Sequence, residues 1–198
     1  MQTLKQVVRR FVPRPIQTPP CPVAVERSEY SAISSVFDEA GWPTRRLVDV
    51  ALEAVERAMK DVEVEDSVWP GEELRLLGGL MLAMRPKVVA EIGRGSGKSA
   101  QVMKRYLPEG GMYRGLGEVA GRILEAEFVL ISGPADGKFE SGVLAQLAGV
   151  PFTRSPIVML NDTRRWEMLR FCRDISYPKV DMTSFGRWTG TLLVELSR

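Results

Sequence analysis

Short apolar runs and longer amphipathic segments follow one another along this chain, which is the pattern of an α/β protein. Short, mostly apolar runs, typical of strands buried on both faces of a parallel sheet, occur at 88–92, 128–131 and 156–160. Helices are expected between and beside them, over 98–106, 139–148 and 164–173, with another ending just before Pro86. A further strand is expected at 112–116, and two more surround a glycine-containing turn near the end of the chain. The pattern predicts an α/β fold whose sheet is mostly parallel.

A glycine-rich turn joins the strand at 88–92 to the helix that follows it. Gly93, Gly95 and Gly97 let the backbone take positive φ angles and bring its N–H groups close to a ligand. Ser96 or Ser99 is placed to cap the helix. A helix N-terminus that faces the carboxyl end of a strand is suited to bind a nucleotide or a carboxylate, so the turn is a candidate cofactor site.

Two common nucleotide motifs do not fit this turn. A P-loop requires a glycine where Ile92 stands, and the dinucleotide fingerprint requires one where Lys98 stands. What does fit is Glu-Ile-Gly-x-Gly-x-Gly, with an acid two residues before Gly93. This motif resembles motif I of the class I S-adenosylmethionine-dependent methyltransferases. The resemblance covers roughly residues 68–198 and implies a Rossmann-like sheet with an antiparallel last strand.

The resemblance also implies how S-adenosylmethionine would be held. Glu91 would take the ammonium group of the cofactor, and Glu118, after the second strand, would bind the ribose hydroxyls. The glycine turn would follow the methionine part of the cofactor, and Ser132 would lie beside it. The residues of that turn are Gly93, Arg94, Gly95, Ser96 and Gly97.

The interval after Glu118 departs from the pattern of that family. Only nine residues separate it from Phe128, where relatives fit a helix, a third strand and another helix. The sheet is therefore expected to lack its usual third strand, and the adenine pocket to be open or built differently. The second strand would then be an exposed edge, which favours dimerisation or the binding of a partner protein.

Three positions where relatives carry polar chemistry are changed in this chain. Ser132 stands where an aspartate usually binds a metal or acts at the reaction centre, and Asn161 stands in an Asp-Asp-Thr or Asp-Asn element. Arg187 replaces the histidine of a Ser-Phe-Gly-His-Trp-x-Gly turn found in relatives from polysaccharide-type clusters. A serine hydroxyl is a poor ligand for a hard cation, so no metal site is predicted. Asp162 and Asp136 are the candidates for the base.

Simpler roles compete for some of these acids. Asp162 or Thr163 would serve equally well as the cap of the helix over 164–173. Glu72 and Glu73, in the first turn of the helix that ends before Pro86, either face the cofactor pocket or complement the helix dipole.

The chain is expected to form one domain over residues 31–198, with a helical lid at 31–84 and a sheet core at 86–198. Residues 1–30 read as a basic extension with a proline-rich linker. Within it, Leu4, Val7 and Phe11 recur at helical spacing among basic residues, which suits a weak contact of residues 1–14 with an anionic membrane surface. A frayed or docked tail is the simpler interpretation.

Composition limits the chemistry. The net charge of +2 gives no support for a nucleic-acid partner, and the absence of histidine from the sequence excludes a histidine base. Cys21 and Cys172 lie far apart without a metal-type spacing, which favours a reducing, cytoplasmic location.

The expected function is S-adenosylmethionine-dependent methyl transfer to a hydroxyl of a small molecule, such as a sugar or glycan precursor. The alternative is a catalytically inactive relative that binds cofactor or a protein partner.

Overall fold

The computed structural model describes residues 54–64, 72–93, 97–117, 123–187 and 189–196. Its helices are α4 (Glu73–Met84), α5 (Lys98–Tyr106), α6 (Lys138–Ala148) and α7 (Trp166–Asp174), and residues 54–59 are also helical. Its strands are β1 (Val88–Gly93), β2 (Met112–Leu116), β3 (Phe128–Ser132), β4 (Ile157–Asn161), β5 (Lys179–Asp181) and β6 (Thr191–Glu195).

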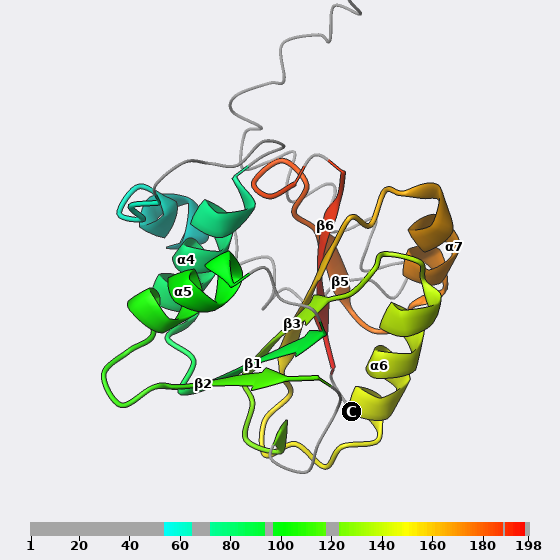
Figure 1. Ribbon diagram of the computed structural model, residues 1–198, viewed down its shortest axis with the longest axis horizontal. Helices are drawn as coiled ribbons and strands as arrows, with labels where there is room; N and C mark the ends of the chain where they lie inside the picture. The colour runs from blue at the N-terminus through cyan, green and yellow to red at the C-terminus, as the bar shows by residue number, and fades with distance from the viewer. Residues whose placement is uncertain (1–53, 65–71, 94–96, 118–122, 188, 197–198) are drawn as a thin grey trace, which may run out of the picture. The chain divides into compact units, whose positions relative to one another are not determined.

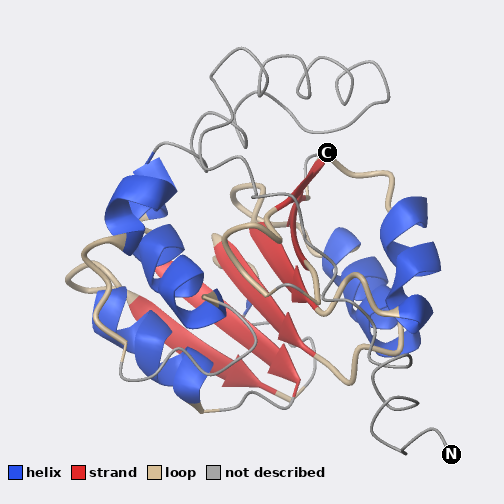
Figure 2. Cartoon of the chain, turned by 90° about the horizontal axis from the view of Figure 1, so that it is seen from above, coloured by secondary structure: helices blue, strands red, loops and turns tan. Residues whose placement is uncertain are grey.

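The strands form one sheet (Figures 1 and 2), and their order in it is β2-β1-β3-β4-β6-β5. β2, β1, β3 and β4 run parallel, while β6 lies antiparallel between β4 and β5. The predicted Rossmann-like sheet with an antiparallel last strand is confirmed. Among the described strands, β2 pairs with β1 alone, in agreement with the short interval that follows it.

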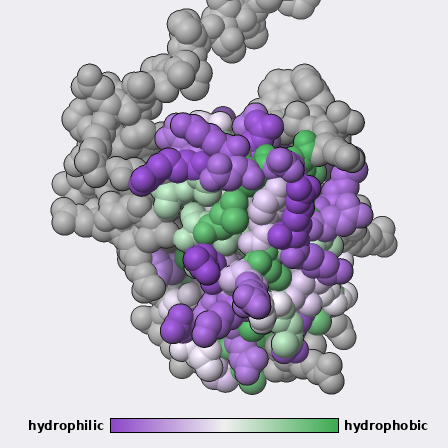
Figure 3. Space-filling model, turned by 90° about the vertical axis from the view of Figure 1, so that its left-hand side faces the viewer, coloured by the Kyte–Doolittle hydropathy of each residue, from purple (hydrophilic) through white to green (hydrophobic). Residues whose placement is uncertain are grey.

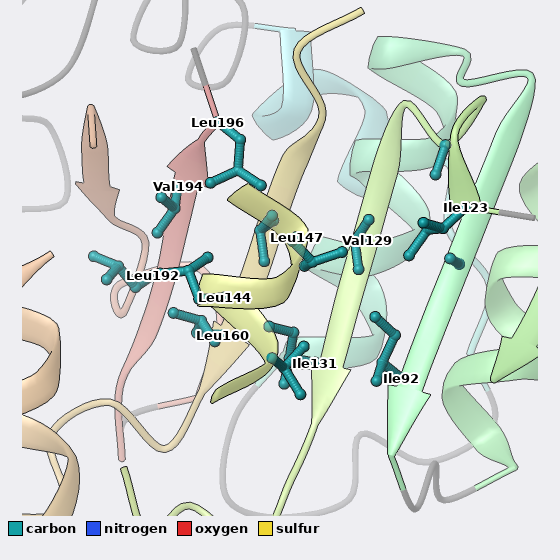
Figure 4. Close-up of a cluster of buried hydrophobic side chains, with 14 of the residues drawn as sticks. Ile92, Ile123, Val129, Ile131, Leu144, Leu147, Leu160, Leu192, Val194 and Leu196 are labelled. Carbon is teal, nitrogen blue, oxygen red and sulfur yellow. The ribbon is translucent and has the colours of Figure 1, made fainter. Parts of the chain in front are cut away.

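Alternate residues of the central strands pack into two hydrophobic clusters, one on each face of the sheet. On β3, Phe128 and Leu130 face the cluster under α4 and α5, whereas Val129 and Ile131 face the cluster under α6. Figure 4 shows this second cluster, in which Leu144 and Leu147 of α6 lie against the sheet. The apolar strand runs are therefore buried on both sides, as a parallel sheet between two helical layers requires.

The first and last glycines of the predicted turn lie at the end of β1 and at the start of α5. Gly93 has a φ of +107° and Gly97 a φ of +75°, both in the region that favours glycine. A methyl group on Gly93 would lie 2.5 Å from the carbonyl oxygen of Ser132, the residue paired with it on β3. Glycine at position 93 thus lets β1 and β3 stay close where both strands end.

The surface on the side of α4 and α5 is mainly hydrophilic, with hydrophobic residues interspersed (Figure 3). No helix in the described part of the chain is long and apolar enough to cross a membrane. The predicted extension over residues 1–30, with its membrane contact, lies outside the described residues.

Candidate functional site

A first pocket of about 240 Å³ opens where β1 and β2 end. Its lining includes Glu91 and Gly93 of β1, Gly97 before α5, and the residues from Gly115 to Gly117 at the end of β2. The sequence prediction of a ligand site at this glycine turn therefore coincides with a cavity. We call this cavity the glycine-turn pocket.

Glu91 is the polar centre of the glycine-turn pocket. The residue is 3% exposed, and three hydroxyl groups donate hydrogen bonds to its carboxylate. Ser99 and Ser132 donate to Oε1 at 2.6 and 2.9 Å, and Tyr113 donates to Oε2 at 2.6 Å. A carboxylate has about four acceptor positions, so one on Oε2 is left for a ligand.

A second pocket, of about 130 Å³, lies beside the first, at the carboxyl ends of β3 and β4. Glu73, Asn161, Asp162 and Arg187 line it, and so do Ser99 and Ser132. These two serines also bind Glu91, so their hydroxyls stand between the two cavities. We call the second cavity the acceptor pocket, after the hydrogen-bond acceptors, chiefly carboxylate oxygens, that line it.

Arg187 links two acids across the acceptor pocket. Its Nη1 donates to Asp162 Oδ2 at 2.9 Å, and its Nε donates to Glu73 Oε2 in a short contact. The other oxygen of each carboxylate accepts a bond from a neutral group: Asn161 Nδ2 donates to Glu73 and Thr189 Oγ1 donates to Asp162. The network joins α4, the end of β4 and the loop before β6.

Burial shifts the protonation of this network. It raises the pKa of the Glu73 carboxyl above its ordinary value, against the opposing influence of Arg187. Burial by itself lowers the pKa of Arg187, but the carboxylates of Glu73 and Asp162 outweigh it and bring the pKa above its ordinary value. Arg187 therefore stays charged, while Glu73 takes up a proton more readily than an ordinary glutamate.

Two expected helix caps are wrong. The N-cap of α7 is Arg165, without a side-chain hydrogen bond, so neither Asp162 nor Thr163 caps that helix. The N-cap of α5 is Gly97, and the Ser99 hydroxyl binds Glu91 instead. In both cases a partner elsewhere in the fold binds the side chain: Arg187 and Thr189 bind Asp162, and the buried Glu91 binds Ser99. The carboxylate of Asp162 is therefore directed to the acceptor pocket.

The structure does not bring Asp136 together with Asp162. The Asp136 carboxylate accepts bonds from the backbone N–H groups of Lys138 and Phe139, both at 2.9 Å, at the start of α6. It lines a separate cavity of about 750 Å³ between α6 and α7. The other predicted cofactor residues, Arg94, Gly95, Ser96 and Glu118, lie outside the described residues.

Sequence reasoning did not assign Tyr113 or Thr189 to the site and treated Ser99 only as a cap. Tyr113 could have been assigned from strand register. Gly115 pairs with Glu91, and Tyr113, two residues earlier on β2, lies on the same face of the sheet because alternate residues of a strand share a face. Within the described residues no group of three or more Asp, Glu, Cys or His side chains forms a metal site.

Comparisons with known proteins locate this arrangement among known folds. No protein-family model matches the sequence, and no curated protein is similar enough to it to indicate a relative. A methyltransferase from Geobacter sulfurreducens matches at 14% identity, over 84% of this chain and 97% of that one, with a TM-score of 0.51. An O-methyltransferase from Bacillus cereus, solved in complex with SAH, matches at 13% identity over 86% and 99%, with a TM-score of 0.47. The first likeness shows that the chain has a Rossmann-like methyltransferase fold.

Proposed function

We propose that this protein transfers a methyl group from S-adenosylmethionine to a hydroxyl of a small molecule. The observation that carries the proposal is the buried carboxylate of Glu91, which has one acceptor position left beside a glycine turn. An ammonium group is the natural partner for that position, because a buried carboxylate is stabilised by an opposite charge. The open space at Gly97 and Gly117, where an added methyl group would meet nothing within 4 Å, suits a bound cofactor.

The bound cofactor would supply an activated methyl group on a sulfonium. The protein would hold the acceptor oxygen in line with that methyl group, and positioning of this kind supplies much of the rate acceleration. In the acceptor pocket, Asp162 or Glu73 would take the proton of the hydroxyl, and the raised pKa of Glu73 suits a base. The small volume of this pocket favours a single hydroxyl-bearing group, such as one sugar hydroxyl.

Calorimetric titration with S-adenosylmethionine and S-adenosylhomocysteine tests the cofactor site. Glu91→Gln keeps the size of the side chain but removes its charge, and a hydrogen bond to a charged group contributes about 1.5–3 kcal/mol. We therefore expect affinity to fall by roughly 10- to 150-fold. Glu167→Gln, an exposed glutamate on α7, is the matched control and should bind as the unmodified protein does. Glu118→Ala tests the ribose prediction in the same titration.

No binding by the folded, unmodified protein would refute the proposal, as would equal affinities for Glu91→Gln and the control. If the cofactor binds, a screen of hydroxylated acceptors follows, with Asp162→Asn and Glu73→Gln as variants. Loss of turnover in one variant with unchanged cofactor affinity would identify the base.

One observation favours a protein that binds cofactor without catalysis. The carboxylates of Glu73 and Asp162, the two candidate bases, are already paired with Arg187, so neither is free until an acceptor displaces a hydrogen bond. Cofactor binding with no turnover on any hydroxylated acceptor would support this second function.

A further inference from the structure

The acceptor pocket surrounds a positive charge with oxygen atoms. Glu73 reaches the guanidinium of Arg187 from α4, and Asp162 reaches it from the end of β4. The side chains of both acids are largely buried, at 14% and 21% exposure. The amide of Asn161 lies beside Glu73, and the hydroxyl of Thr189 lies beside Asp162.

Two buried carboxylates this close repel each other unless a cation lies between them. Oxygen donors of these kinds, carboxylate, amide and hydroxyl, are the ones that hard divalent cations prefer. Without Arg187 the lining of this small polar cavity would hold three carboxylates, an amide and two serine hydroxyls. The third carboxylate, that of Glu140, already accepts bonds from two backbone N–H groups. That arrangement would attract a divalent cation.

The backbone around Asp162 is in close contact with the loop that carries Arg187. Asp162 has a φ of +57°, a left-handed conformation that is uncommon outside glycine. Next to it, the backbone N–H of Thr163 donates to the Gly190 carbonyl and that of Arg164 donates to the Thr189 carbonyl. A methyl group on Gly190 would lie 2.4 Å from the Arg164 nitrogen, so the two loops are in close contact. This contact fixes the segment that carries Arg187 against Asp162.

We propose that the guanidinium of Arg187 is the resident cation of the acceptor pocket and takes the place between Glu73 and Asp162 that a divalent metal ion would otherwise occupy. Arg187 is thus a positioning residue, which holds two acids from distant parts of the chain in one pocket. The inference goes beyond methyl transfer and does not depend on it.

The test is to remove the guanidinium and measure cation binding. Arg187→Gln keeps a polar side chain without the charge, and Mn²⁺ and Ca²⁺ alone serve as probes in calorimetric titration. We expect the variant to gain a site with a dissociation constant on the order of 10⁻³ M or tighter, within the range of protein calcium sites. The unmodified protein should show no such site. Adding Asp162→Asn to the variant should abolish it.

Arg164→Gln provides a matched control. Arg164 forms an ion pair with Asp181 at 3.0 Å, but both side chains are about half exposed and the pair lines no acceptor pocket. The same substitution there should create no cation site. If Arg187→Gln folds poorly, its melting temperature should rise with Mn²⁺ while that of the double variant does not.

Two results would overturn the inference. One is a folded Arg187→Gln that gains no Mn²⁺ or Ca²⁺ affinity over the unmodified protein, or a poorly folded one whose melting temperature Mn²⁺ does not raise. The other is a divalent cation site in the unmodified protein that Asp162→Asn removes. Neither result bears on the titration with S-adenosylmethionine, so this inference and the proposed function fail separately.

Discussion

The buried amine of Lys179 makes the free energy of unfolding depend on pH above neutrality. Lys179 is 1% exposed, at the start of the edge strand β5. Its Nζ donates hydrogen bonds to the carbonyls of Cys172, Arg173 and Ile175, at the C-terminal end of α7. Burial lowers the pKa of Lys179 from 10.5 to about 8.

The sign and size of the effect follow from these two values. Below pH 8 the amine is protonated in the folded and the unfolded chain, and the cost of burying its charge is fully present. Between pH 8 and 10.5 only the unfolded chain keeps the proton, so the free energy of unfolding rises with pH by up to about 1.4 kcal/mol per unit. Burial raises the pKa of the Cys172 thiol to about 11, which acts in the opposite direction above its ordinary value of 9. A comparison with a variant that lacks Lys179 therefore isolates the lysine, whose own contribution rises by about 1 kcal/mol between pH 8 and 9.

Urea denaturation of the unmodified protein and of Lys179→Met, at several values between pH 8 and 9, measures this contribution. The difference in free energy of unfolding between the two should shift by about 1 kcal/mol in favour of the unmodified protein as the pH rises. Lys138→Met, an exposed lysine on α6, should show a constant difference. A constant or falling difference for Lys179→Met would refute the reasoning.

Three further predictions concern the site. Gly93→Ala should lower the free energy of unfolding by about 1–3 kcal/mol in urea titrations, because of its positive φ and the nearby Ser132 carbonyl. The control is Gly142→Ala, in open space within α6, which should instead raise the free energy of unfolding by about 1 kcal/mol. If both variants changed the free energy of unfolding equally, the close approach of β1 and β3 would be contradicted. Asp136→Ala should lower the free energy of unfolding by about 1 kcal/mol, because the first N–H groups of α6 lose their acceptor, and should leave turnover unchanged. Lost turnover in a folded variant would support the predicted catalytic role of Asp136. An excess of EDTA should leave methyl transfer unchanged, and a loss that Mn²⁺ restores would contradict the role of Arg187.

The fold could be predicted because its signals are local. The strand β3 is a continuous apolar run, and α4 ends where Arg85 precedes a proline, which disfavours helical backbone. The short interval before β3 likewise follows from counting residues. Such features need no knowledge of which strands are neighbours.

The acceptor pocket could not be predicted in the same way. Glu73 and Arg187 stand 114 positions apart, and they meet only because β6 lies beside β4. Glu91 was accessible to prediction since its spacing to Gly93 is fixed, but its partner Tyr113 depends on the register of β1 against β2. A sequence identifies the residue types at a site, while the sheet order decides which of them share a cavity.

The place of β6 has a consequence for how the protein is made. This strand comes last among those described, yet it lies inside the sheet, bonded to β4 on one side and β5 on the other. While residues up to 185 have left the ribosome but those of β6 have not, β4 has an unpaired apolar edge and Arg187 is missing from the acceptor pocket. A nascent chain therefore cannot complete the sheet or the pocket until nearly all of the described residues are synthesised, and truncation before Thr191 would remove an interior strand rather than a tail.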